Sequence, residues 1–168
     1  QGADLENPFY NGTVLLIAAY SGQLEAVRHY ISRGANVNAR SETPGAKPGN
    51  HYNTGETPLH RAAFCKPALR GQGMMDNQAY TGIVQALLEA GADVNARTDL
   101  DAPSDMGPGV VAQGETPLHF AAICGDEEMI TLMLDAGADK TIDSAKDETP
   151  LDFARAHNRP KTIIDMLK

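Results

Sequence analysis

The chain has 168 residues, of which 42% are hydrophobic, and a formal net charge of −8 at pH 7. This length and composition suit one domain with a sizeable core. The negative charge argues against nucleic acid or an anionic membrane as the main partner, and no apolar run is long enough to cross a bilayer.

One motif recurs along the chain. In chain order, its copies are Gly-Thr-Val-Leu-Leu-Ile-Ala-Ala at 12–19, Gly-Glu-Thr-Pro-Leu-His-Arg-Ala-Ala at 55–63, Gly-Glu-Thr-Pro-Leu-His-Phe-Ala-Ala at 114–122 and Glu-Thr-Pro-Leu-Asp-Phe-Ala at 148–154. The threonine can cap a helix, and the proline suits the first helical position, where its missing N–H would have no partner. Gly34, Gly91 and Gly137 are placed to end a second helix. Each copy therefore predicts a turn, a short helix, a turn, a longer helix and a loop.

Units of this kind cannot bury their apolar faces alone, but a stack of them can. The motif, together with the 33-residue separation of Thr116 and Thr149, resembles the ankyrin-repeat family, and the resemblance covers nearly the whole chain. It implies an all-α ankyrin-repeat solenoid of four helix-turn-helix units. These units would form a single domain over 1–168, with repeats at about 12–40, 55–97, 114–146 and 147–168.

Three stretches exceed the length of the family repeat. Motif threonines are 44 residues apart between Thr13 and Thr57, and 59 apart between Thr57 and Thr116. The prolines and glycines among the extra residues indicate loops, and the first and third loops lie where the family has its hairpin fingers. All three surround repeat two, at about 41–53, 66–78 and 99–112.

The resemblance also implies where a partner would bind. In ankyrin-like stacks, the partner surface is the concave side. It is formed by the hairpin fingers, the residue before the motif threonine and the residues after the alanine pair. Here these positions give an acidic row beside an apolar row led by two aromatic residues, which are frequent interface anchors. The alternative is that the apolar row packs under the insertions. The candidate protein-binding residues are Tyr20, His51, Tyr52, Glu56, Phe64, Asp99, Asp101, Asp105, Met106, Glu115 and Ile123.

No catalytic residue is predicted. His60 and His119 hold the histidine of the motif, whose ring is expected to bond to local backbone, and Asn38 and Asn95 are expected to tie the hairpins together by side-chain bonds. The acidic run at 99–105 lacks the third alternating ligand, the turn glycine and the terminal glutamate of an EF-hand. We therefore expect no cofactor and no metal site.

A second class of function stays open. An enzyme or a metal-binding protein could have its site between the first and third insertions, using His51, Tyr52, Asp99 and Asp101. Bound metal or measurable turnover would favour this class, whereas a stable complex with a protein would favour the binding module.

The two cysteines, Cys65 and Cys124, each lie eight residues after a motif threonine. Equivalent positions in stacked repeats are roughly 10 Å apart, whereas a disulfide needs Cα atoms within about 7 Å. This spacing predicts two free thiols.

Four repeats with long insertions suggest one dedicated protein partner, and a monomer in the free state. Similarity to compact bacterial ankyrin proteins adds a narrower hypothesis, in which the chain restrains or protects a partner enzyme whose cleft has a basic rim. The periplasm and the cytoplasm both stay open as compartments, because the sequence begins at Gln1 without Met.

Overall fold

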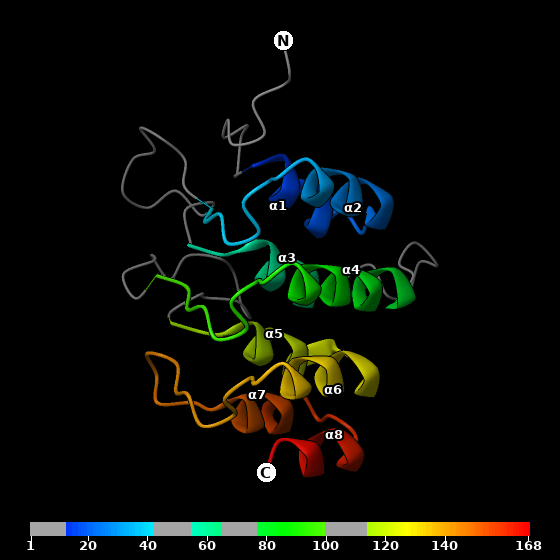
Figure 1. The fold of residues 1–168 in the computed structure, drawn as a ribbon. Helices are drawn as coiled ribbons and strands as arrows, with labels where there is room; N and C mark the ends of the chain where they lie inside the picture. Colours follow the sequence, from blue (N-terminus) through cyan, green and yellow to red (C-terminus); the bar gives the residue numbers. More distant parts are fainter. Residues whose placement is uncertain (1–12, 42–54, 65–76, 100–113) are drawn as a thin grey trace.

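The computed structural model describes residues 13–41, 55–64, 77–99 and 114–168 (Figure 1). Within these ranges there are eight α-helices and no strand, so the expected all-α architecture is confirmed. None of the helices in these ranges is long and apolar enough to cross a bilayer. The helices are α1 (Val14–Tyr20), α2 (Leu24–Ser32), α3 (Pro58–Ala63), α4 (Asn77–Glu89), α5 (Pro117–Cys124), α6 (Glu127–Asp135), α7 (Pro150–Ala156) and α8 (Lys161–Met166).

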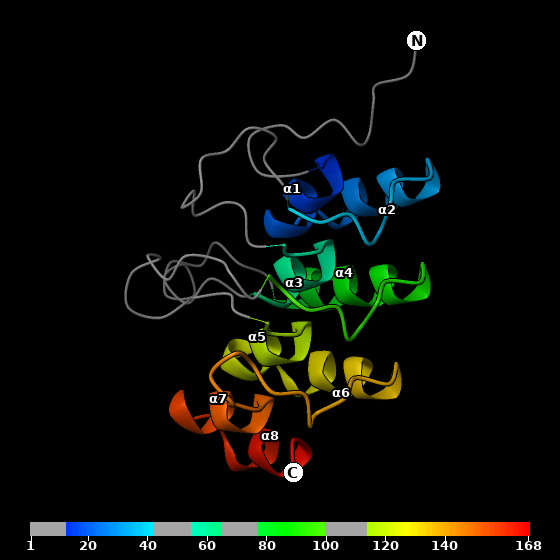
Figure 2. The same ribbon diagram turned by 90° about the vertical axis from the view of Figure 1, so that its left-hand side faces the viewer.

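The helices form two parallel columns. The first helix of each pair packs on the first helix of the next, in the order α1, α3, α5, α7, and the second helices stack beside them in the order α2, α4, α6, α8. Figures 1 and 2 show the resulting four layers, with α1 and α2 at one end and α7 and α8 at the other. We call the column of first helices the inner column.

The motif threonines begin the first helices. Thr13 Oγ1 accepts a hydrogen bond from the Leu16 N–H, and Thr149 Oγ1 accepts one from the Asp152 N–H. Proline follows the capping threonine in α3, α5 and α7, where the lack of an N–H costs no helical hydrogen bond. Helix ends follow the prediction as well, because Gly34, Gly91 and Gly137 have φ values of 84°, 87° and 88°.

The core lies between the two columns. Alanine pairs in α3 and α5 are fully buried, and their small side chains let neighbouring helices approach closely. Around them pack large side chains with no exposed surface, which are Leu15, Leu59, Ile83, Leu87, Leu118, Ile130 and Met133.

Two asparagines join consecutive hairpins, as expected. Asn38 Nδ2 donates to Gly91 O at 3.2 Å, and its Oδ1 accepts from the Asp93 N–H at 2.8 Å. Asn95 repeats this pair of bonds one unit further on, to Gly137 O and from the Asp139 N–H. Each asparagine therefore satisfies backbone groups that would otherwise rely on water.

Some residues at the edges of the expected insertions belong to the described structure. Helix α4 begins at Asn77, so the last two residues of the stretch 66–78 are helical. Ser41, at the start of the first insertion, is buried, and its N–H donates to Glu56 O at 2.7 Å. Asp99, at the start of the third insertion, is also described. The other residues of the three insertions, and residues 1–12, lie outside the described residues.

Cys124 corrects the sequence-based expectation. It is bonded in a disulfide, and no described cysteine is free. The other cysteine of the chain is Cys65, which lies outside the described residues, so the prediction of two free thiols is wrong. The spacing argument failed because α3 ends at Ala63 and Phe64 has a non-helical ψ of 85°, whereas α5 continues to Cys124. The spacing argument assumed two first helices of equal length, which the described ends of α3 and α5 do not show.

The thiol state can be measured directly. We expect the unfolded, non-reduced protein to take up no thiol reagent until a reductant is added. Reduction should lower the free energy of unfolding by about 4 kcal/mol, because the disulfide closes a loop of roughly 60 residues in the unfolded chain. Labelling of both thiols without a reductant would contradict the disulfide.

Leu118→Ala tests the packing of the inner column. Leu118 is fully buried, so its truncation should lower the free energy of unfolding by about 2–5 kcal/mol through lost transfer energy and a residual cavity. Leu132→Ala on the half-buried side of α6 is the matched control and should cost less. Urea titration measures both, and equal losses would contradict this assignment of the core.

Candidate functional site

Four side chains from α1 and α3 form a small surface on the inner column. Ile17 and Tyr20 lie one turn apart on α1, and Arg61 and Phe64 lie one turn apart at the end of α3. Ile17 is 41% exposed, and no other large hydrophobic residue in the described ranges is as exposed. Tyr20, Arg61 and Phe64 are partly exposed. We call these four residues the inner-helix patch.

Arg61 joins the two halves of the patch. Its Cζ lies 5.2 Å from the centroid of the Tyr20 ring, a geometry in which the ring quadrupole attracts the cation. Its Nε lies 2.6 Å from Glu56 Oε2, and the two side chains are 16% and 6% exposed. The guanidinium is thus held from one side by a carboxylate and from another by an aromatic face.

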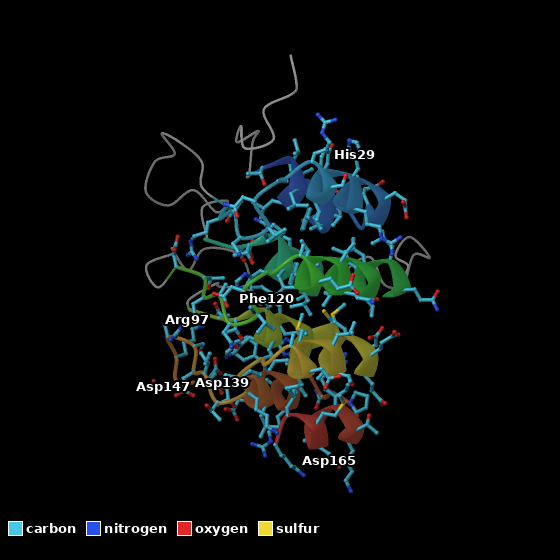
Figure 3. All side chains as sticks on the ribbon, in the orientation of Figure 1. His29, Arg97, Phe120, Asp139, Asp147 and Asp165 are labelled. Carbon is cyan, nitrogen blue, oxygen red and sulfur yellow. The ribbon has the colours of Figure 1, made fainter. Side chains whose placement is uncertain are left out.

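Aromatic contacts continue from the patch down the column. The Phe64 and Phe120 rings meet edge to face, with centroids 5.8 Å apart and an interplanar angle of 86°. Phe120 also meets the His60 ring at 5.6 Å, and His119 meets Phe153 at 5.1 Å. Phe120 itself is almost fully buried and lies inside the stack in Figure 3. Phe64 is therefore supported from beneath by a fixed ring.

The motif histidines are structural, and they link consecutive repeats. His60 Nδ1 accepts from the Thr57 N–H at 3.1 Å, which leaves the Nε2–H to donate to Glu115 O at 3.1 Å in the next repeat. His119 does the same with Thr116 and with Glu148 O. The expectation that these rings bond to backbone is confirmed, and the bond across the repeat boundary is an additional finding.

Burial keeps both imidazoles neutral. Desolvation by burial is the main cause that lowers the pKa of His60 from 6.5 to about 3, and the nearby charges of Arg40 and Arg61 lower it further. Desolvation likewise lowers the pKa of His119 from 6.5 to about 4, assisted by Arg97. A neutral ring with its proton on Nε2 suits the bonds described above and leaves no proton acceptor for catalysis.

Most of the predicted acidic row is not available at the surface. Glu56 is buried against Arg61, and Glu115 is buried with its Oε2 accepting from Thr98 Oγ1 at 3.1 Å. Glu148, in the last repeat, is exposed. Asp99 is exposed and forms an ion pair with Arg40 at 2.5 Å. The first two carboxylates therefore serve the stack rather than an open face.

The predicted apolar row is also only partly at the surface. Tyr20 and Phe64 are partly exposed, whereas Ile123 is 8% exposed and packs with Phe153. The predicted finger residues His51, Tyr52, Asp101, Asp105 and Met106 lie outside the described residues. No group of three or more histidine, cysteine or acidic side chains that could hold a metal is found within the described ranges.

Sequence reasoning missed Arg61 and Ile17 as members of the site. The signal was present in the motif itself. The position after the motif histidine holds Phe120 in repeat three and Phe153 in repeat four, but Arg61 in repeat two and Ile17 in repeat one. A charge at a position that is otherwise apolar could have marked Arg61.

Comparison with known proteins shows which family the chain belongs to. The family model for ankyrin repeats, in three copies, matches residues 1–98 and 75–168. The chain belongs to the ankyrin-repeat family. Ankyrin repeats are protein–protein interaction modules, so the ankyrin-repeat chain is of this general class.

The curated relatives that the chain matches are much longer than this chain. Neurogenic locus notch homolog protein 1 of Mus musculus is 26% identical over 90% of the chain but only 6% of the relative. Ankyrin repeat and SOCS box protein 5 of Bos taurus is 35% identical over 62% of the chain and 25% of the relative. Palmitoyltransferase ZDHHC13 of Homo sapiens is 43% identical over 32% of the chain and 8% of the relative. The chain therefore spans a quarter or less of the length of each of these relatives.

The buried histidines predict how acid affects this ankyrin-repeat stack. In the unfolded chain both histidines bind protons below about pH 6.5, while in the folded chain they stay neutral until about pH 4 or 3. Their contribution to stability is complete above pH 6.5 and is lost as the pH falls toward 4. Between pH 7.5 and pH 5, the free energy of unfolding should fall by about 2 kcal/mol for each histidine.

Urea unfolding at several pH values measures this effect. His119→Asn should remove about half of the pH dependence, whatever its effect on absolute stability, because one titrating group is gone. His29→Ala, on the exposed face of α2, is the control that should leave the contribution of the buried pair unchanged. Equal stability of the wild-type chain at pH 7.5 and pH 5 would contradict the assignment.

Proposed function

We propose that this ankyrin-repeat chain binds one dedicated protein partner through the inner-helix patch. The observation that carries the proposal is the exposure of Ile17 beside Tyr20 and Phe64 on the inner column. Large apolar and aromatic side chains at the centre of a polar rim are the usual anchors of protein interfaces. The patch also includes an arginine, which is enriched at such positions.

Rigidity supports the patch as an anchor. Phe64 rests on Phe120, and Arg61 is held by Glu56 and Tyr20. Side chains that are already fixed lose little conformational entropy when a partner binds. A fixed patch therefore favours one partner of complementary shape over many partners of different shapes.

Charge supports a basic rim on the partner. The loop at 137–148, between α6 and α7, carries four exposed carboxylates. Figure 3 labels two of them, Asp139 and Asp147, on the side of the stack where the loops between repeats lie. Carboxylates at a rim act mainly on the association rate and its salt dependence. They are Asp139, Asp143, Asp147 and Glu148.

The fingers complete the proposal. We place His51, Tyr52, Asp101, Asp105 and Met106 in contact with the same partner, since their segments lead into the motifs that begin α3 and α5 of the inner column. A protruding element of the partner would lie between the fingers with one side on Tyr20 and Phe64. If the partner is an enzyme, this arrangement would obstruct its cleft, and binding would inhibit it.

The test starts from a partner captured from extract and identified by mass spectrometry. Phe64→Ala should weaken its binding by about 2 kcal/mol, or roughly 30-fold in Kd, if Phe64 is an anchor. Ile17→Asp should also weaken binding, because it places an unpaired charge in the apolar contact. Isothermal titration measures both.

His29→Ala on the opposite column is the matched control and should bind like the wild type. Urea unfolding of each variant separates lost binding from lost folding. If Phe64→Ala and Ile17→Asp bind with unchanged affinity, the partner uses another surface and the proposal fails.

A further inference from the structure

The guanidinium of Arg61 is only partly used within the described chain. Its Nε lies against Glu56 Oε2, and its Cζ lies over the Tyr20 ring. Neither contact occupies the two terminal Nη groups, which carry four of the five N–H donors of arginine. The side chain is 16% exposed, so part of it reaches the surface of the inner-helix patch.

Stability does not explain an arginine at this position. Equivalent positions in repeats three and four hold Phe120 and Phe153, which pack against the motif histidines. Burying an ion pair such as Glu56–Arg61 costs desolvation of both groups, and replacing such pairs by apolar residues is often neutral or stabilising. A guanidinium here is therefore better explained by recognition than by folding.

We propose that Arg61 is the specificity-determining residue of the patch and receives a carboxylate of the partner at its two Nη groups. The inference rests on the proposed function, because it names the chemistry of the partner at the same surface. Two parallel N–H donors match the two oxygens of a carboxylate. The occupant is an acidic segment of a protein, with an apolar side chain beside the carboxylate to cover Ile17 and Phe64.

Glu56 determines which anion fits. It already supplies one negative charge at 2.6 Å from Arg61 Nε. A singly charged carboxylate at the opposite edge shares the guanidinium with Glu56, whereas a phosphate monoester would bring close to two negative charges beside it. Like charges that share one site repel each other, so the carboxylate is favoured.

The experiment uses a phage-displayed library of random linear peptides, selected on the whole chain and on Arg61→Met. Methionine keeps much of the length of arginine and removes its donors. Peptides selected by the wild type should share an aspartate or glutamate beside an apolar or aromatic residue. Peptides selected by Arg61→Met should keep the apolar residue and lose the acid.

A double-mutant cycle measures the interaction between Arg61 and the acidic residue of the peptide. Changing the shared acid of a synthetic peptide to its amide should weaken binding to the wild type at least tenfold and to Arg61→Met less than twofold. Arg61→Lys keeps the charge without the forked donors, so it should lose part of the affinity. Urea unfolding shows whether each variant is folded.

The outcomes separate this inference from the proposed function. Peptides that need Phe64 and Ile17 but tolerate the amide would overturn the role of Arg61 and leave the patch in place. Peptides indifferent to Phe64→Ala, Ile17→Asp and Arg61→Met would overturn both. No enriched peptide above an unrelated control protein would also count against both.

Discussion

The bond between the motif histidine of one repeat and the backbone of the next is the interaction on which the inner column depends. His60 and His119 each accept at Nδ1 from the capping threonine of their own helix and donate at Nε2 across the repeat boundary. Each histidine side chain thus fixes both the start of its own helix and the distance of that helix from the next repeat. Because the rings are buried and neutral, Nδ1 keeps the lone pair that accepts from the threonine N–H, and protonation would remove that acceptor.

The surface of the stack follows from this constraint. Because the spacing between consecutive inner helices is fixed, Tyr20 of α1 lies against Arg61 of α3, and Phe64 lies against Phe120 of α5. The asparagine bonds hold the hairpins at the same spacing. The inner-helix patch is therefore a property of neighbouring repeats together, because no single repeat contains its geometry. This is why a small stack can present a rigid binding surface.

Local chemistry predicted the helices well and the site only in part. The Thr-Pro starts, the glycine ends and the asparagine bonds depend on residues close in sequence or repeated at fixed spacing, so the motif was sufficient. Burial of Glu56 and Glu115 depends on their contacts with Arg61 and Thr98, which the repeat pattern does not specify. The cysteine prediction failed because α3 is shorter than α5. Asp147, at φ 58°, takes the place that glycine holds before the second and third motifs, a substitution that pattern alone does not reveal.

The most direct test of the account asks which column a partner covers. Hydroxyl-radical footprinting of the chain, free and bound to its captured partner, reports the exposure of individual aromatic side chains. Tyr20 and Phe64 on the inner column should become protected on binding, while His29 and Tyr30 on α2 should react as in the free chain. Protection of His29 and Tyr30, with Tyr20 and Phe64 unchanged, would contradict the claim that the inner column is the binding surface.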